Sequence, residues 1–97
     1  MFVRMISGTV KPGTVAEGIA IFKDSIVPAM KEQPGFISTT LLVNESESKF
    51  ISLSHWETEA DMQAGEASGY HQAQVAKIAT ILTAPPANEH FEVAVQA

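Results

Sequence analysis

The imidazole of His71 is the side chain in this sequence best suited to acid–base chemistry. His71 precedes Val75 by four residues and Ile78 by seven, so it shares their inward stripe on a predicted helix. With an unperturbed pKa of about 6.5, such an imidazole is able to remove a phenolic proton at neutral pH and leave an electron-rich ring that reacts with oxygen. The alternative is a histidine near a helix start that bonds only backbone or solvent.

Two aromatic side chains are candidates for contact with a ligand. Trp56, the only tryptophan, ends a predicted strand, and its flat ring with one N–H donor could stack on an aromatic molecule. Core packing is the alternative for Trp56, because large aromatic residues in small domains are usually structural. Tyr70 is next to His71 and could donate a hydrogen bond at a pocket mouth, but it lies on a different helical face, which favours exposure to solvent.

Further polar candidates lie on the predicted strands. His55 is on the strand face opposite Trp56, so only one of these two side chains can face a pocket inside the subunit, and the other is expected to meet a partner subunit. Ser7 and Ser54, together with Ser52, could hydrogen-bond a ligand. Buried serines also commonly bond backbone groups, which is the alternative for all three.

The sequence contains no pattern typical of a metal, nucleotide or acyl-transfer site. Its three histidines are far apart, none forms an HxxxH or HxxE pair, and cysteine is absent. A histidine cluster formed across strands is the one metal alternative. There is also no G-x-S-x-G elbow, glycine-rich phosphate loop or dinucleotide fingerprint. These observations predict no metal site and argue against hydrolase and nucleotide-enzyme functions.

Length and charge indicate one acidic domain, residues 1–97. A chain of 97 residues has no room for a second domain. The formal net charge is −5, from 6 Lys and Arg against 11 Asp and Glu, so no basic field exists to bind nucleic acid or an anionic membrane. The first ten residues alternate and are too few for a membrane span or a signal peptide, so a cytoplasmic location is expected.

The first part of the chain predicts a strand followed by an irregular helix. Residues 2–10 are rich in Val, Ile, Met and Phe and stop at a Lys-Pro-Gly turn. Residues 14–17 have the S/T-x-x-E spacing of a capping box, which predicts a helix start at Thr14. An apolar stripe with helical spacing follows, and Pro28 within it predicts a kink or irregularity between residues 25 and 31.

The remainder predicts a hairpin, an interrupted helix and a last strand. Residues 36–44 and 49–57 have the composition of strands around a polar turn at 45–48. Thr58 offers an N-cap to a short helix, which the Ser68-Gly69 pair interrupts before a second segment at 70–83. Residues 90–96 alternate again. The resulting order, βαββαβ, predicts a ferredoxin-like α+β fold with an antiparallel sheet and helices on one face.

Both faces of the predicted hairpin carry large apolar residues. By alternation, one set contains Ile37, Leu41, Val43, Ile51 and Leu53, and the other contains Phe36, Leu42, Phe50 and Trp56. Helices can cover only one face, and a second copy of the sheet, related by a two-fold axis, is the economical cover for the other. A homodimer formed through the sheet face is therefore predicted, against the alternative of a monomer with scattered exposed apolar residues.

Two segments resemble the antibiotic biosynthesis monooxygenase family, a branch of the dimeric α+β barrel superfamily. Residues 26–36, IVPAMKEQPGF, look like the family's helix end and its E-x-P-G-type turn into the second strand. Residues 54–61, SHWETEAD, are similar to its strand that ends in Trp before a capped helix. The likeness covers essentially the whole chain and implies a dimeric α+β barrel with a pocket in each subunit between sheet and helices. It also implies an activity, because some members oxygenate polycyclic phenols or quinols with molecular oxygen and without metal or flavin, so no cofactor is expected.

The chain departs from this family at three positions that matter for chemistry. Many members carry a His in the helix after the Trp, where this sequence has Ala64-Gly65. The haem-degrading branch has an Asn on the first strand, aligned with Ser7, and a haem-ligating His, aligned with Val75. The resemblance therefore argues against haem degradation.

Two functions are consistent with these residues. The first is a cofactor-independent monooxygenase for a small aromatic, polyphenolic or quinol-type molecule, with His71 as base, Trp56 as stacking wall, and Tyr70, Ser7, Ser54 and His55 as substrate contacts. The second is a non-catalytic dimeric domain that binds a small ligand or serves a stress-related role. Fold alone does not decide between them. An apolar pocket with converging polar groups would favour the enzyme, and a solidly packed interface between sheet and helices would favour the binding domain.

Overall fold

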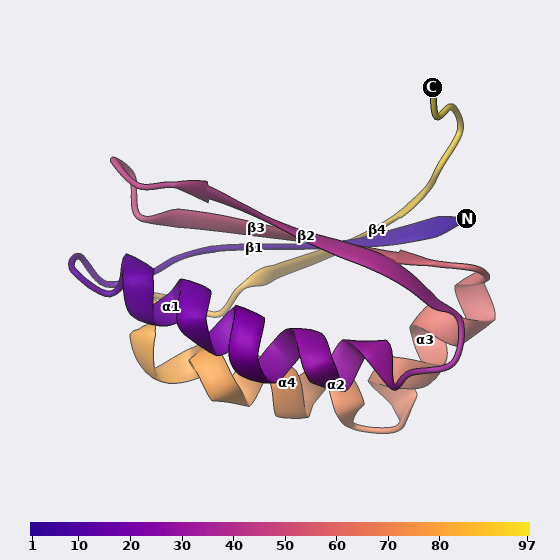
Figure 1. The fold of residues 1–97 in the computed structure, drawn as a ribbon, viewed down its shortest axis with the longest axis horizontal. Helices are drawn as coiled ribbons and strands as arrows, with labels where there is room; N and C mark the ends of the chain where they lie inside the picture. The colour runs from indigo at the N-terminus through magenta and orange to yellow at the C-terminus, as the bar shows by residue number, and fades with distance from the viewer.

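One antiparallel sheet carries the helices of this chain on a single face (Figure 1). The structure, a computed structural model, describes all residues from Met1 to Ala97. The strands are β1 (Phe2–Thr9), β2 (Phe36–Asn44), β3 (Lys49–Trp56) and β4 (Ala87–Glu92). Their order in the sheet is β2-β3-β1-β4, so β2 and β4 are the edge strands. The predicted ferredoxin-like α+β fold is thereby confirmed.

The helices come from two stretches of the chain. The first stretch consists of α1 (Val15–Ile21), a π-helical turn (Phe22–Ile26) and α2 (Val27–Lys31). The second consists of α3 (Glu59–Ala67), α4 (Tyr70–Ile78) and a 3-10 turn (Ala79–Ile81). The break between α3 and α4 is at Ser68-Gly69, as predicted, and Gly69 has a left-handed φ of 84° that suits glycine. None of these helices has the length and apolar composition needed to cross a membrane.

The irregularity predicted around Pro28 lies mainly in the turn just before it. The Val27 N–H donates to the carbonyl of Phe22, five residues back, where an α-helix would use the residue four back. Pro28 has no N–H to continue the ladder, and it lies in the first turn of α2, where that donor is not needed. The π-helical turn and the proline thus form one local adjustment, in which Phe22 and Ile26 remain buried.

The two predicted helix caps differ. Thr58 Oγ1 accepts a hydrogen bond from the Asp61 N–H at 3.1 Å, as predicted for an N-cap. Helix α1 also begins at the predicted place, but its capping box is not formed, because Thr14 Oγ1 donates to the Lys11 carbonyl at 2.6 Å. The hydroxyl that was expected to cap the helix therefore closes the preceding turn.

The last strand begins and ends earlier than the predicted range of 90–96. Its partner β1 starts at Phe2, which lies opposite Glu92, so the residues after 92 have almost no β1 left to pair with. One further bond, from the Val93 N–H to the Met1 carbonyl at 3.0 Å, ends the pairing. The chain then leaves the sheet on the side away from the helices (Figure 1).

The pairing register corrects the predicted division of apolar residues between the two faces. Leu41 and Val43 were grouped with Ile51, but they lie opposite Ser52 and Phe50 on the face that the helices cover. Leu42, which was grouped with Phe50, lies opposite Ile51 on the other face. Alternation defines the faces within one strand, whereas the relation between strands depends on the register. A bulge between Phe36 and Ser38 shifts the register once more at the start of β2.

No helix covers the other side of the sheet, termed the open face below. Its apolar members are Val3, Met5, Leu42, Ile51, Leu53 and Phe91. Leu42 and Phe91 are 46% and 48% exposed. Both sheet faces are therefore apolar, although the residues are distributed differently from the prediction.

Two buried clusters join the helices to the sheet. One consists of Val10, Phe50 and Ile81, and the other of Phe22, Ile26 and Met30. Gly18 lets α1 lie close to β3, because a Cβ at this position would come within 2.5 Å of the Phe50 ring. The helices are therefore held against the sheet at both ends, and a cavity remains between them.

Candidate active site

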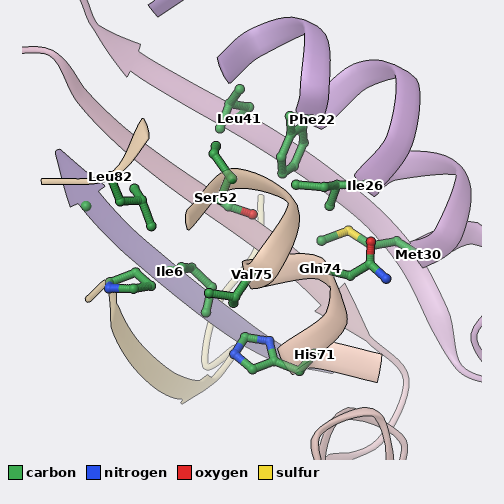
Figure 2. Close-up of a pocket in the computed structure, with 13 residues that line it drawn as sticks. Ile6, Phe22, Ile26, Met30, Leu41, Ser52, His71, Gln74, Val75 and Leu82 are labelled. Carbon is green, nitrogen blue, oxygen red and sulfur yellow. The ribbon is translucent and has the colours of Figure 1, made fainter. Parts of the chain in front are cut away.

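The cavity lies between the covered sheet face and the helices, and its volume is about 80 Å³ (Figure 2). Most of its wall is apolar and includes Ile6, Phe22, Met30, Leu41, Val75 and Leu82. These residues come from β1, the π-helical turn, α2, β2, α4 and the segment before β4. The cavity therefore depends on the whole βαββαβ arrangement and not on one local motif.

Three polar side chains, Ser52, His71 and Gln74, are part of the wall. Figure 2 shows the Ser52 hydroxyl turned inward from the sheet and the His71 ring at the edge of the site beside β1. Neither side chain makes a hydrogen bond within the chain, whereas the Gln74 carbonyl oxygen accepts from Lys77 Nζ at 2.8 Å. Ser52 and His71 are thus the groups available to a bound molecule.

The surroundings of His71 favour the neutral form of its imidazole. Burial lowers the pKa of His71 below its ordinary value of 6.5, and the positive charge of nearby Arg4 lowers it further, although Glu66 acts in the opposite direction. A neutral imidazole is the form that accepts a proton. The prediction that His71 faces inward agrees with its place in the cavity wall.

Trp56 is packed in the core and does not line the cavity. Its side chain is completely buried, and its Nε1–H donates to Ser54 Oγ at 3.0 Å. The Phe36 ring meets it edge-on, with centroids 5.6 Å apart, and the Arg4 guanidinium lies 5.6 Å from its ring centroid. The structure therefore places Trp56 and Ser54 in a buried contact with each other, away from the cavity.

Arg4 anchors a polar cluster beside this core. Its side chain is only 2% exposed, and it donates from Nε to Glu66 Oε1 at 3.1 Å and from Nη2 to the Met62 carbonyl. The same Glu66 oxygen is 2.9 Å from Asn88 Nδ2 and 2.8 Å from His90 Nε2. Burial acts to raise the pKa of Glu66, but these hydrogen bonds and the charge of Arg4 hold it below its usual value. The cluster ties β1, α3 and β4 together.

Tyr70 is half-buried, which corrects the predicted exposure to solvent. Its ring packs against the cluster of Phe22, Ile26 and Met30, and its hydroxyl is buried without a hydrogen-bond partner. Burial raises the pKa of Tyr70 to about 12, and the Arg4 charge offsets this only in part. Tyr70 therefore stays protonated and belongs to the packing between α4 and the first helical stretch.

Sequence comparison connects this architecture with a known family. The family model for antibiotic biosynthesis monooxygenase matches residues 1–77. The chain belongs to this family. A search of curated proteins found no relative that matches the sequence.

Solved structures of family members and related proteins share the fold. SnoaB, a cofactor-independent oxygenase from Streptomyces nogalater solved as a mutant, is 18% identical with a TM-score of 0.81, covering 98% of this chain and 94% of that one. The monooxygenase from the gene ActVA-Orf6 of Streptomyces coelicolor, in complex with nanaomycin D, is 19% identical with a TM-score of 0.77, covering 99% and 91%. MhuD, a haem degrader from Mycobacterium tuberculosis with two haems bound in its active site, is 25% identical with a TM-score of 0.79, covering 100% and 99%.

The structure shows what surrounds two of the positions at which this chain departs from the family. Gly65, which stands near the expected helical His, is buried, and an added Cβ would lie 3.3 Å from the Tyr70 ring. Val75 is in the cavity wall, where it offers no metal-ligating atom. No group of three or more His, Asp or Glu side chains is arranged to hold a metal ion.

Two further predicted site residues lie on the open face. Ser7 is opposite Ile51 in the sheet, and His55 is opposite Val3, so both point away from the cavity. His55 is partly buried there, and its Nδ1 has no hydrogen-bond partner. Their predicted contact with a substrate in this cavity has no geometric support, whereas the expectation that His55 and Trp56 point to opposite faces agrees with the register.

Gln74 is a cavity residue that the sequence prediction did not name, and Ser52 was named there only as one of three serines able to hydrogen-bond a ligand. Ser52 alternates with Phe50 and Ser54 on the covered face of β3, so its inward direction follows once one residue of that strand is placed. Gln74 is three residues after His71 and shares its helix face. The sequence signals were present, but a serine and a glutamine carry too little information alone to stand out.

Proposed function

We propose that this chain is an oxygenase that uses molecular oxygen on a small phenol or quinol, with His71 as general base. The observation that supports this most directly is the apolar cavity into which a neutral His71 and the unpaired Ser52 hydroxyl both face. An apolar site with few polar groups suits an aromatic substrate. Membership of the monooxygenase family and the fold shared with SnoaB add support.

The proposed reaction converts a phenol with a free para position to a quinone. His71 takes the phenolic proton, and the para carbon of the phenolate forms a C–O bond with O2. The resulting peroxide takes the proton back from His71. Loss of the remaining hydrogen of that carbon as a proton then breaks the O–O bond, which leaves a carbonyl and releases hydroxide that becomes water. One oxygen atom enters the product, and the substrate supplies all four electrons.

The test is oxygen consumption by the purified protein, after treatment with a chelator, on a panel of single-ring phenols and catechols that have a free para position, with 1-naphthol and an anthrone as larger comparisons. We expect turnover by the wild type and a loss of about 100-fold or more in His71→Ala, since a general base contributes at least that factor. His55→Ala, which changes a histidine on the opposite sheet face, is the matched control and should retain turnover. A His71→Ala variant with full turnover would exclude the proposed base.

We also propose that two copies pair through their open faces. Leu42 and Phe91 are nearly half exposed, and they lie on the same face as Ile51 and Leu53. Large exposed apolar patches are uncommon on stable monomers. A second copy related by a two-fold axis would bring the same residues onto each other and cover both patches at once.

The second candidate is the non-catalytic domain, and the small cavity favours it because the interface between sheet and helices is close to solidly packed. Ligand sites for drug-sized molecules usually measure about 300 Å³ or more, and this cavity is about 80 Å³. Binding of a phenol without oxygen uptake on any substrate would favour this candidate. Haem degradation, as in MhuD, does not fit, because Val75 has no ligating atom and the cavity is far too small for a macrocycle.

A further inference from the structure

A groove of about 440 Å³ lies immediately outside the cavity, between α4 and the start of β4. It shares four wall residues with the cavity, namely Ile6, His71, Val75 and Pro86. It adds three residues of its own, Gln72, Ala76 and Asn88. The cavity and the groove therefore meet at a common boundary, and His71 is the titratable side chain on that boundary.

We propose that the cavity and the groove form one two-part site for a single-ring phenol that carries a neutral polar substituent next to its hydroxyl. The ring occupies the cavity, the hydroxyl faces His71 at the boundary, and the substituent extends into the groove. This inference rests on the proposed function in taking the cavity as the ligand site, and it adds the class of ligand.

The volume of the inner part limits the ring system. A dry apolar cavity of about 150 Å³ is known to hold benzene, and this cavity measures about 80 Å³. Met30, a flexible unbranched side chain in the wall, can yield enough for one ring. Met30 and Phe22 belong to the same buried cluster and Leu41 packs against it, but only Met30 has an unbranched side chain that changes shape readily. Two fused rings in the cavity would also require the rigid Phe22 ring and the branched Leu41 to move.

The chemistry of the outer part selects the substituent. Gln72 and Asn88 present amide groups, and no formally charged side chain lines the groove. Asn88 Nδ2 already donates to Glu66 at 2.9 Å, which leaves its carbonyl oxygen to accept a hydrogen bond. The nearby charges of Arg4 and Glu66 are paired with each other. A neutral group that both donates and accepts, such as a carboxamide, matches this surface better than a carboxylate or an ammonium group.

The experiment compares the binding of three probes to the whole protein by titration calorimetry without oxygen, so that chemistry plays no part. The probes are phenol, 2-hydroxyphenylacetamide and 1-naphthol. We expect 2-hydroxyphenylacetamide to bind about tenfold more tightly than phenol, which corresponds to one net hydrogen bond in the groove. We expect 1-naphthol to bind more weakly than 2-hydroxyphenylacetamide, despite its larger apolar surface.

Two variants of α4 separate the groove from the rest of the helix. Ala76→Phe fills the groove and should remove the tenfold advantage of 2-hydroxyphenylacetamide while leaving phenol binding unchanged. Ala73→Phe is the matched control, because Ala73 is an exposed alanine on the same helix that lines neither part, and it should change neither affinity.

The inference is overturned if 1-naphthol binds as tightly as 2-hydroxyphenylacetamide, if the two phenylalanine variants behave alike, or if no probe binds. These outcomes concern binding only. Selective binding of 2-hydroxyphenylacetamide without oxygen uptake on any substrate would therefore sustain the two-part site and remove the proposed oxygenase function.

Discussion

The surroundings of His71 determine whether it carries a proton. Burial and the charge of Arg4 disfavour the imidazolium, so the pKa of His71 is lowered in the folded chain. These influences are absent in the unfolded chain, which therefore binds a proton at His71 at higher pH than the folded chain does. The contribution to stability is complete above the unfolded pKa of about 6.5 and is lost as the pH falls through the folded-state pKa.

Replacing His71 with Gln, which does not titrate, should remove this part of the pH dependence. Between about pH 7.5 and about pH 5, we expect the free energy of unfolding of the wild type to fall more than that of His71→Gln. Urea denaturation at the two pH values measures both changes. Equal falls in the two proteins would show that the pKa of His71 is not lowered on folding.

Glu66 is the only carboxylate paired with the buried Arg4. Glu66→Gln removes that charge and leaves Arg4 uncompensated, so we expect a loss of about 1–3 kcal/mol in the free energy of unfolding, less than for a fully buried pair because Glu66 is partly exposed. Denaturant titration provides the measurement. Glu59→Gln, on an exposed position of the same helix, should change stability by less than about 0.5 kcal/mol. Similar effects of the two substitutions would contradict the structural role of the pair.

Single residues of the site were predictable only where a pattern constrained them. The apolar stripe through Val75 gave the inward direction of His71, because helical spacing fixes which residues share a face. The same reasoning misplaced Tyr70, because the helix is covered on more than one side and its packing against Met30 depends on tertiary structure. For Trp56, the sequence was consistent with either ligand stacking or core packing. Its complete burial beside Arg4 identifies it as a core residue.

Helices α1 and α3 each contain a glycine without a left-handed backbone, so only space distinguishes the two positions. A Cβ on Gly18 would meet the Phe50 ring at 2.5 Å, well inside van der Waals contact, in a cluster that cannot yield easily. A Cβ on Gly65 would meet the Tyr70 ring at 3.3 Å, a gap that a small shift relieves.

Replacing Gly18 and Gly65 with alanine should therefore change the stability of the protein by different amounts, or in opposite directions. Gly18→Ala is expected to destabilise the protein by about 1–3 kcal/mol through overpacking, in spite of the better helix propensity of alanine. Gly65→Ala gains up to about 1 kcal/mol from the better helix propensity of alanine, and the smaller clash with Tyr70 offsets part of this gain. Its stability should therefore remain within about 1 kcal/mol of the wild type. Thermal and urea denaturation of both variants test this, and a Gly18→Ala protein as stable as Gly65→Ala would contradict the close approach of α1 to the sheet.

At the scale of elements, local sequence signals predicted β1, β2, β3 and the starts of the helices well. They failed for features that depend on a partner elsewhere in the chain. Residues 90–96 alternate as a strand should, yet pairing with β1 begins at Ala87 and ends near Val93. Thr14 has the right spacing for a capping box, but the turn at Lys11 competes for its hydroxyl. Such competition is not visible in the sequence of one element.

At the scale of the whole molecule, the open face should control association. Leu42→Glu places a charge on the exposed edge strand β2, and we expect it to weaken the proposed dimer by about tenfold or more, because pairing would bury that charge without a partner. Sedimentation equilibrium measures the change. Ile19→Glu is the matched control, since Ile19 is 38% exposed on α1 and lies in the helical layer. An unchanged association constant for Leu42→Glu would argue against pairing through this face.

The overall fold and the family were within reach of the sequence, because element order and two short segments specify them together. The cavity was not. Its volume depends on how Phe22, Leu41 and Met30 fit against one another, and the faces of β2 and β3 depend on a register that includes a bulge. These properties arise from contacts between distant segments, which one sequence does not reveal.

Successive residues of β3 point to opposite sides of the sheet. Ser52 reaches the cavity, while its neighbours Ile51 and Leu53 belong to the open face. Natural selection can therefore act on the two surfaces separately. In descendants of this chain, changes at every second position of β3 would reshape the cavity and leave the open face as it is. Changes at the intervening positions would alter the open face, where we propose that two copies pair, and leave the cavity wall intact.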